Sequence, residues 1–161
     1  MKENMHLFWG GPFSQWLPSK FIVDGMEYNC AEQFMMAKKA ELFGDEAALK
    51  KIMKLTDPSI QKKVGRQIKG FVKEVWERIA KEIVFKANLA KFAQNEKLKN
   101  FILSTGDTII VEASPYDIIW GIGLDQNDPD ARDRTKWKGT NWLGEVLMDV
   151  RDKIREMDKE Q

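Results

Sequence analysis

Residues 28–40 read YNCAEQFMMAKKA, an apolar helical stretch that contains one acid and two adjacent lysines. Successive residues of an α-helix turn by about 100°, so Glu32 and Lys39 return to nearly the same face, two turns apart. Met35 and Met36 lie between them on that face. A carboxylate and an amine that share an apolar face indicate either a buried ion pair or the two working groups of an active site.

The same stretch also allows ordinary roles for these residues. Asn29 is available as an N-cap, and Glu32, three residues later, is then in the capping-box position, while Gly44 suits the end of the helix. Helical lysines usually extend to water, and Lys38 points about 100° away from Lys39. We expect one lysine to be solvated and Lys39 to share the side of Glu32. Spacing alone leaves the capping and active-site roles of Glu32 open.

The composition predicts one domain spanning residues 1–161. Hydrophobic residues make up 43% of the chain, which is enough for a substantial core. The 26 basic and 25 acidic residues nearly cancel, so no overall field indicates a binder of nucleic acid or membrane surfaces. An anionic partner must therefore be held by a local site.

The reactive side chains exclude several kinds of site. The single cysteine, Cys30, cannot form an internal disulfide or a cysteine-rich zinc site, and the single histidine, His6, leaves the rest of the chain without the commonest zinc ligand. We therefore expect no metal and no cofactor. The N-terminal residues contain no signal-peptide pattern, and no run of about 18 apolar residues occurs, so a cytoplasmic protein that does not enter the membrane is expected.

Turn and capping signals predict an α+β fold that is predominantly helical, with helices around a long central helix and a few short strands. Residues 6–16 suit an extended segment that runs into a tight turn, and residues 21–28 suit a hairpin around Asp24-Gly25. Helices are expected at about residues 29–44, 45–53, 73–94, 96–103 and 141–157, the last with Thr140 or Asn141 as cap. A further strand is expected at about residues 108–114.

A basic cluster of Lys62, Lys63, Arg66 and Lys69 follows Asp57-Pro58. Runs of charge usually form a solvated face. The alternative is a phosphate-binding edge, with Gly65-Arg66 best placed to reach a ligand. Both interpretations remain open.

Aromatic residues and glycines gather in two segments. In residues 8–16 the rings of Phe8, Trp9, Phe13 and Trp16 either fill the core or stack on a ligand that approaches the backbone at Gly10 and Gly11; different rings can do each. Residues 114–124, SPYDIIWGIGL, lack the glycine spacing of a dinucleotide fingerprint. A loop that presses its backbone and a tryptophan against a flat ligand is the better interpretation.

The remaining chemistry involves carboxylates, one lysine and aromatic rings, because the GxSxG, GxxxxGK[ST] and HExxH motifs do not occur. Paired carboxylates suit glycosidic cleavage. A desolvated lysine favours the neutral amine, which attacks a sugar aldehyde carbon to give a Schiff base. Both chemistries meet in one substrate class, a ribose whose C1 carries a nitrogen base.

Five blocks in this order resemble the NADAR family, also called YbiA-like proteins, from about residue 8 to 151. They are GGPFSQW, FIVDGMEYNCAEQFMMAKKA, WERIAKEIVFKANLAKF, IIVEASPYDIIWGIGL and WKGTNWLGEVLMDVR. The resemblance implies a mainly helical fold without a metal and an N-glycosidase activity on ribosylated, nucleobase-like compounds. Its implied substrates are phosphorylated ribosylamino-pyrimidine intermediates of riboflavin synthesis or ADP-ribosylated guanine in nucleic acid.

Matched position by position, the resemblance implies that Lys39 is the Schiff-base lysine, Glu32 its acid–base partner and Asp117 a second catalytic carboxylate. Lys38 departs from the family pattern, since many relatives have glutamine there. Asn141 can bind a ligand or cap its helix. The expected substrate-binding residues are Trp9, Gly11, Phe13, Ser14, Trp76, Glu112, Trp120, Gly121 and Asn141.

The alternative function is a non-catalytic binding module for NAD-derived or ADP-ribosylated ligands. Such a module would use the same aromatic loop, but it has no use for a desolvated Lys39 beside Glu32. The expected partner is a small ribosyl or ADP-ribosyl substrate, with ADP-ribosylated nucleic acid as a second candidate.

Overall fold

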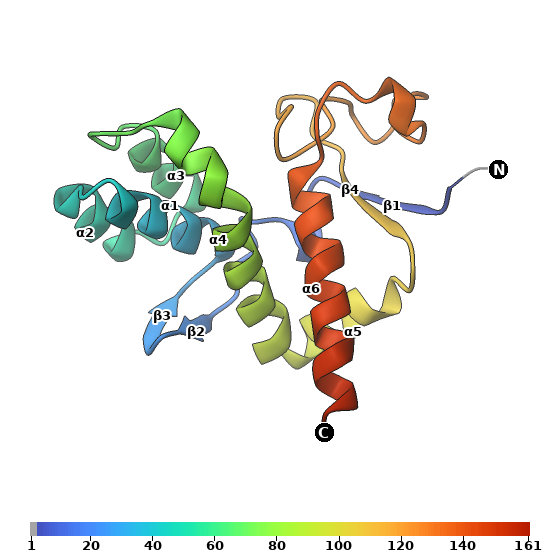
Figure 1. The fold of residues 1–161 in the computed structure, drawn as a ribbon, viewed down its shortest axis with the longest axis horizontal. Coiled ribbons are helices and arrows are strands. Elements are labelled where there is room, and N and C mark those ends of the chain that lie inside the picture. Colours follow the sequence, from blue (N-terminus) through green and yellow to red (C-terminus); the bar gives the residue numbers. More distant parts are fainter. Residues whose placement is uncertain (1–2) are drawn as a thin grey trace. The chain divides into compact units, whose positions relative to one another are not determined.

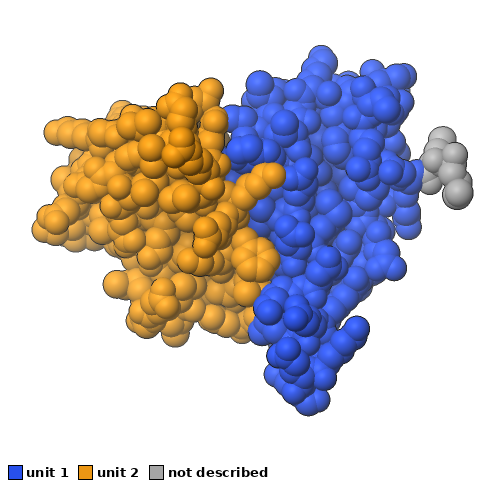
Figure 2. Space-filling view, viewed as in Figure 1, with its two compact units in different colours: residues 1–14, 96–161 blue, residues 15–95 orange. Residues whose placement is uncertain are grey.

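The computed structural model describes residues 3–161, which divide into two compact units (Figure 2). Unit 1 takes residues 3–14 and 96–161, and unit 2 takes residues 15–95. The chain therefore leaves unit 1 after its first strand and turn, builds unit 2 without interruption, and then returns. The single domain expected from composition stays a prediction.

Unit 2 is built on α1, the helix formed by the stretch that opens the sequence analysis. This helix packs against α2, α3 and α4 (Figure 1). Every residue from 31 to 37 is buried, and a helix that is apolar on all sides is one that other elements enclose. The elements of unit 2 are β2 (Phe21–Val23), β3 (Met26–Tyr28), α1 (Ala31–Leu42), α2 (Glu46–Lys54), α3 (Pro58–Gly65) and α4 (Lys73–Gln94).

The β2–β3 hairpin forms where the sequence predicts it. Asp24 and Gly25 have φ angles of 51° and 79°, as in the two-residue turns that match the twist of a hairpin. Phe21 pairs with Tyr28 across the antiparallel strands. The Tyr28 ring meets the Phe34 ring edge-on, with centroids 4.9 Å apart, so the hairpin packs on α1.

The start of α1 differs from the prediction. Cys30, not Asn29, is the N-cap, and its sulfur accepts the backbone N–H of Gln33 at 3.4 Å. The side-chain oxygen of Gln33 in turn accepts the N–H of Asn29, the residue before the N-cap, at 2.8 Å. The predicted cap at Asn29 and capping-box position of Glu32 are therefore wrong. The reason is tertiary, since the Asn29 side chain donates to the carbonyl of Leu55.

A lysine lies in the core of unit 2. Lys91 of α4 is fully buried, on one stripe of the helix with Val84, Ala87 and Asn88. Burial lowers the pKa of Lys91 from its ordinary value of 10.5 to about 7, with the charge of Cys30 acting in the opposite direction. The neutral amine is therefore a substantial species near neutral pH.

Unit 1 is built on two parallel strands that are distant in the sequence. Met5 of β1 lies opposite Ile109 of β4, and Phe8 opposite Glu112. Helix α6 packs against β4 and α5. Val111 belongs to the apolar core beneath this strand pair. The elements of unit 1 are β1 (Met5–Phe8), η1 (Gly11–Phe13), α5 (Glu96–Ser104), β4 (Ile109–Glu112), η2 (Arg134–Lys136) and α6 (Trp142–Lys159).

Asn141 joins the start of α6 to β4. It occupies the N-cap position, but its side chain makes no capping hydrogen bond. Instead its Oδ1 accepts the Glu112 N–H and its Nδ2 donates to the Ile110 carbonyl, both at 3.0 Å. A Cβ at Gly144 would lie 2.0 Å from the Ile110 oxygen, so glycine is what lets α6 approach β4 this closely.

Carbonyls of the loop at residues 114–123 satisfy the first N–H groups of α6. Trp142 donates to Ile119 and Leu143 donates to Trp120, each at 3.1 Å. The predicted side-chain cap of α6 is therefore replaced by backbone carbonyls. This arrangement also holds the loop in place, because helical N–H groups have fixed directions.

The predicted fold class, α+β and mainly helical, is confirmed. Residues 58–65, for which no helix is expected, form a helix with Asp57 as N-cap, and the strand is shorter than residues 108–114. Among residues 3–161, the structure contains no helix with the length and apolar character needed to cross a bilayer.

Replacing Asn141 by glycine tests the brace between α6 and β4. Glycine tolerates the φ of 54° at this position, so a loss of stability measures the contribution of the side-chain hydrogen bonds. We expect Asn141→Gly to lower the free energy of unfolding by about 3 kcal/mol, because two buried backbone groups lose their partners. Thr140→Gly, which removes one exposed hydrogen bond, is the control in urea unfolding. Equal losses in the two variants would contradict the brace.

The buried Lys91 predicts a pH-dependent stability. The unfolded chain binds more protons than the folded chain between the folded pKa of about 7 and the ordinary value of 10.5. The free energy of unfolding should therefore rise across this range, by on the order of 1 kcal/mol per pH unit. The Lys91→Met variant should lose this rise relative to the wild type in urea unfolding at pH 7, 8 and 9. Parallel pH profiles would contradict the prediction.

Candidate active site

The Lys39 amine lies against two aromatic rings contributed by the start of α4. Its Nζ is 4.6 Å from the centre of the Phe71 ring and 5.6 Å from that of Trp76. Gly70 has a φ of 81°, a left-handed conformation that favours glycine, and this turn places Phe71 ahead of the helix. The Phe71 ring also contacts Phe43 at the end of α1. Lys39 is half-buried, so its amine is partly desolvated.

Burial lowers the pKa of the Lys39 amine. The charge of Glu32 acts to raise it, the charge of Arg66 acts to lower it, and the net direction is downward. Glu32 is only 6% exposed, so its carboxylate acts through a poorly solvated region. A lower pKa increases the neutral fraction of the amine, which is the nucleophilic form.

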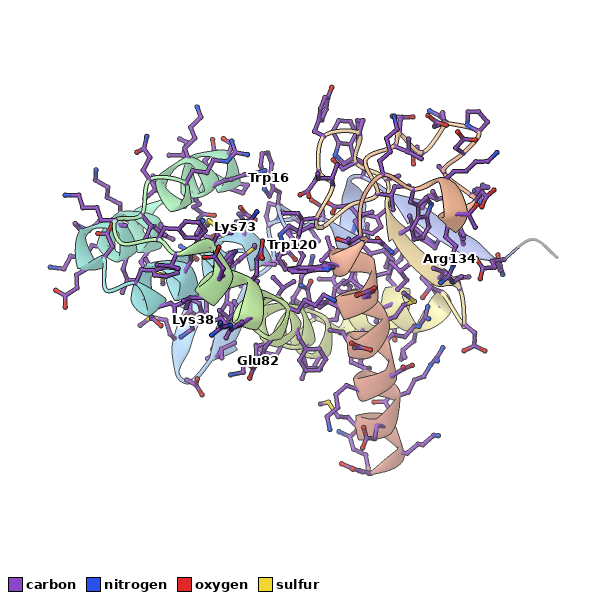
Figure 3. The ribbon with its side chains drawn as sticks, turned by 45° about the horizontal axis from the view of Figure 1, so that its top comes forward. Trp16, Lys38, Lys73, Glu82, Trp120 and Arg134 are labelled. Atoms are coloured by element: carbon purple, nitrogen blue, oxygen red, sulfur yellow. The ribbon has the colours of Figure 1, made fainter. Side chains whose placement is uncertain are left out.

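Lys38 has a different environment from Lys39. Its Nζ lies 3.1 Å from a carboxylate oxygen of Glu41, and it contacts Tyr28 near the hairpin (Figure 3). Burial acts to lower the pKa of Lys38, but the bond to Glu41 and neighbouring negative charges outweigh burial, so the pKa is raised. The prediction that Lys39, and not Lys38, shares the side of Glu32 is confirmed.

Helix α3 brings Arg66 into electrostatic range of the amine. Gly65 lies directly on Met36 of α1, where a Cβ would be 1.9 Å from the Met36 sulfur. The absence of a side chain at Gly65 therefore allows the close contact between α3 and α1. Arg66 follows as the exposed C-cap of α3, and its charge reaches Lys39.

The predicted carboxylate Asp117 organises its own loop in unit 1. Its Oδ1 accepts the N–H of Ile119 at 2.9 Å and that of Trp120 at 2.8 Å. The Trp120 ring meets the Trp142 ring edge-on at 5.5 Å, at the start of α6 (Figure 3). Asp117 therefore has a structural function, and its catalytic assignment stays a prediction.

The aromatic residues at 8–16 divide between core and surface. Phe8 and Phe13 are 6% and 1% exposed, so the core role is confirmed for these two. Trp9 and Trp16 are 51% and 42% exposed. The Trp9 ring contacts that of Tyr116 with centroids 5.9 Å apart. Whether any of these rings meets a substrate stays a prediction.

The expected site residues fall in both units. Unit 2 holds Lys39, Trp76 and Glu32. The Trp76 ring contacts the Lys39 amine, and the charge of Glu32 acts on that amine. The roles of the others stay predictions. Unit 1 holds Trp9, Gly11, Phe13, Ser14, Glu112, Asp117, Trp120, Gly121 and Asn141.

Sequence reasoning missed Phe71 and the buried Lys91, and it did not connect Arg66 with Lys39. Lys91 had a usable signal, because it falls within the helix on the stripe of Val84 and Ala87, whereas Lys81 and Lys86 do not. Phe71 had none, since it precedes α4 in an exposed segment. Its position over the amine depends on tertiary packing.

The NADAR domain profile matches residues 7–155 of the chain. N-glycosidase R617 of Acanthamoeba polyphaga mimivirus is 44% identical over 145 residues, which cover 87% of this chain and 85% of the relative. N-glycosidase YbiA of Escherichia coli (strain K12) is 28% identical over 144 residues, covering 89% and 81%. Riboflavin biosynthesis protein PYRR, chloroplastic, of Arabidopsis thaliana is 34% identical over 124 residues, covering 77% of this chain and 16% of that protein.

The solved structure of E. coli YbiA, determined by NMR, superimposes with a TM-score of 0.81. It is 26% identical and covers 100% of this chain and 90% of its own. These matches confirm the resemblance seen in the five sequence blocks. The chain belongs to the NADAR domain family.

Proposed function

We propose that this chain hydrolyses the N-glycosidic bond between a ribosyl group and a nucleobase-like ring, with Lys39 as the nucleophile. Support comes from the lowered pKa of the Lys39 amine, which lies against Phe71 and Trp76 and within electrostatic range of Glu32. A surface lysine in a helix gains nothing from this combination, whereas an amine that must attack a carbon at neutral pH does.

The class of reaction follows from the family. The relatives R617 and YbiA are named N-glycosidases, and R617 shares 44% of its aligned residues with this chain over most of both lengths. The chain is therefore a hydrolase that acts on N-glycosyl bonds. Its substrate and its covalent step are the proposed part.

In the proposed mechanism, Glu32 gives a proton to the ribosyl ring oxygen, and the ring opens to leave C1 doubly bonded to the nitrogen of the base. The neutral Lys39 amine adds to C1. The base nitrogen then takes a proton and leaves, and C1 remains bonded to Nζ as a Schiff base. Water adds to C1, the bond to Nζ breaks, and the sugar aldehyde and the free amine are restored. One water is consumed for each bond cleaved.

Two substrate classes fit this chemistry. One is a phosphorylated ribosylamino-pyrimidine, which the riboflavin-biosynthesis name of the relative PYRR favours. The other is ADP-ribosylated guanine, free or in nucleic acid. Asp117 as a second carboxylate and Trp120 as a stacking ring belong to the same proposal.

Trapping tests the covalent step. During turnover of a ribosylamino-pyrimidine phosphate, borohydride should reduce the Schiff base and attach the sugar to Lys39, as read in a peptide mass spectrum. Lys39→Ala should lose at least about 100-fold in kcat/KM and all of the adduct. Lys38→Ala is the matched control and should keep both. Full activity in Lys39→Ala would replace the covalent route with hydrolysis by two carboxylates.

The role of Glu32 predicts a rate loss and a shift in the pH profile. Glu32→Gln should lower kcat/KM by about 100-fold or more while substrate binding is retained. Because the charge of Glu32 raises the pKa of Lys39, its removal should move the acidic limb of the profile to lower pH. Glu41→Gln, which removes the partner of Lys38, should change neither. Unchanged turnover in Glu32→Gln would leave the binding module as the better function.

A further inference from the structure

Lys62 of α3 and the C-cap residue Arg66 have no acid on their own helix. Lys62 and Arg66 are four residues apart, a spacing that places them on one side of a helix. Residues 57–66 contain a single acid, Asp57, whose Oδ1 is used in the N-cap by Ser59. In the part of the chain that the structure describes, neither cation forms an ion pair.

Two lysines of α4 have acidic neighbours on their own helix. Lys73 lies 3.8 Å from Glu77, and Lys86 lies 3.8 Å from Glu82, each with helical spacing. This pairing is the ordinary arrangement of a solvated helix face. Lys62 and Arg66 have no such partner, so their charges can act on an anion, as the phosphate-binding interpretation requires.

The first cation, Arg66, lies near the proposed nucleophile. The contact between Gly65 and Met36 sets α3 on α1, and Lys39 is one helical turn beyond Met36. The charge of Arg66 is felt at the Lys39 amine, opposite in effect to that of Glu32. A group held by Arg66 is therefore held beside the amine.

The second cation, Lys62, lies over an exposed ring. Its Nζ is 5.9 Å from the centre of the Trp16 ring, which is 42% exposed. The ring limits the positions of a side chain that would otherwise move freely. The charge of Lys62 is thereby localised on the same side of α3 as Arg66.

We propose that Arg66 and Lys62 bind a phosphate carried on the ribose whose C1 is attacked by Lys39, so that the enzyme selects phosphorylated over unphosphorylated ribosyl substrates. This inference rests on the proposed function. The planar guanidinium of Arg66 matches two phosphate oxygens at once, and the ammonium of Lys62 adds a point charge. Binding of the remote phosphate then positions C1 at the amine.

The test compares a ribosylamino-pyrimidine with and without its sugar phosphate. In the wild type, kcat/KM should be higher for the phosphorylated form. Arg66→Gln should lose at least about 10-fold on the phosphorylated form, mainly through KM, with a much smaller loss on the other form. Lys62→Gln should show a weaker loss of the same kind. Lys63→Gln, one position along α3, is the matched control and should behave as the wild type.

Equal losses of Arg66→Gln on both substrates, or no preference in the wild type, would overturn the phosphate site. A second expected readout is the acidic limb of the pH profile. Because Arg66 lowers the pKa of Lys39, Arg66→Gln should move that limb to higher pH with the unphosphorylated substrate. A limb that stays in place would contradict the proximity of Arg66 to the amine.

Binding measurements separate this proposal from the proposed function. In full-length chains that carry Lys39→Ala, calorimetry should show tighter binding of ribose 5-phosphate than of ribose, and Arg66→Gln should abolish the difference. This result supports the phosphate site even when no substrate is cleaved. A preference for ADP-ribose alone, lost in Arg66→Gln, would assign the site to a diphosphate. Equal binding of ribose, ribose 5-phosphate and ADP-ribose would overturn it.

Discussion

The enclosure of α1 by the other elements of unit 2 determines where polar groups can lie in this unit. Taking a charged group out of water costs several kcal/mol unless partners compensate for it. Glu32 and Lys39 lie two turns apart on this helix, and burial removes part of the hydration of each side chain. At Lys39 the rings of Phe71 and Trp76 offset part of this cost, and burial lowers the pKa of the amine.

At the start of α1, the residues that cap the helix differ from the residue proposed for catalysis. The Cys30 sulfur accepts the Gln33 N–H, and the Gln33 side chain accepts the Asn29 N–H, so the helix does not depend on Glu32 for its cap. Glu32 instead occupies a buried position, and its charge affects both the Cys30 thiol and the Lys39 amine. Spacing left the two roles of this residue open, and the observed cap removes the capping role.

Local signals were enough to predict much of the fold. The turn at Asp24-Gly25, the helix that begins after Asp45, and the periodicity of α4 each depend on neighbours in sequence. The cap at Cys30 was not predictable, because the competing Asn29 side chain is bound to the distant Leu55 carbonyl. The brace at Asn141 was not predictable, because its partners lie in β4. The candidate site follows the same division. Helical spacing predicts the shared face of Glu32 and Lys39, whereas the ring of Phe71 and the charge of Arg66 reach the amine only through tertiary packing.

The pairing of β1 with β4 has a consequence for the order in which the chain folds. Met5 and Ile109 can pair only when both have been synthesised, so the strand pair of unit 1 forms only after more than 100 residues have been synthesised. Unit 2 is continuous from residue 15 to 95, and all of its helices are complete before β4 exists. During synthesis, the unit that carries Lys39 can therefore acquire its core first, while β1 keeps an unpaired edge until its partner is made.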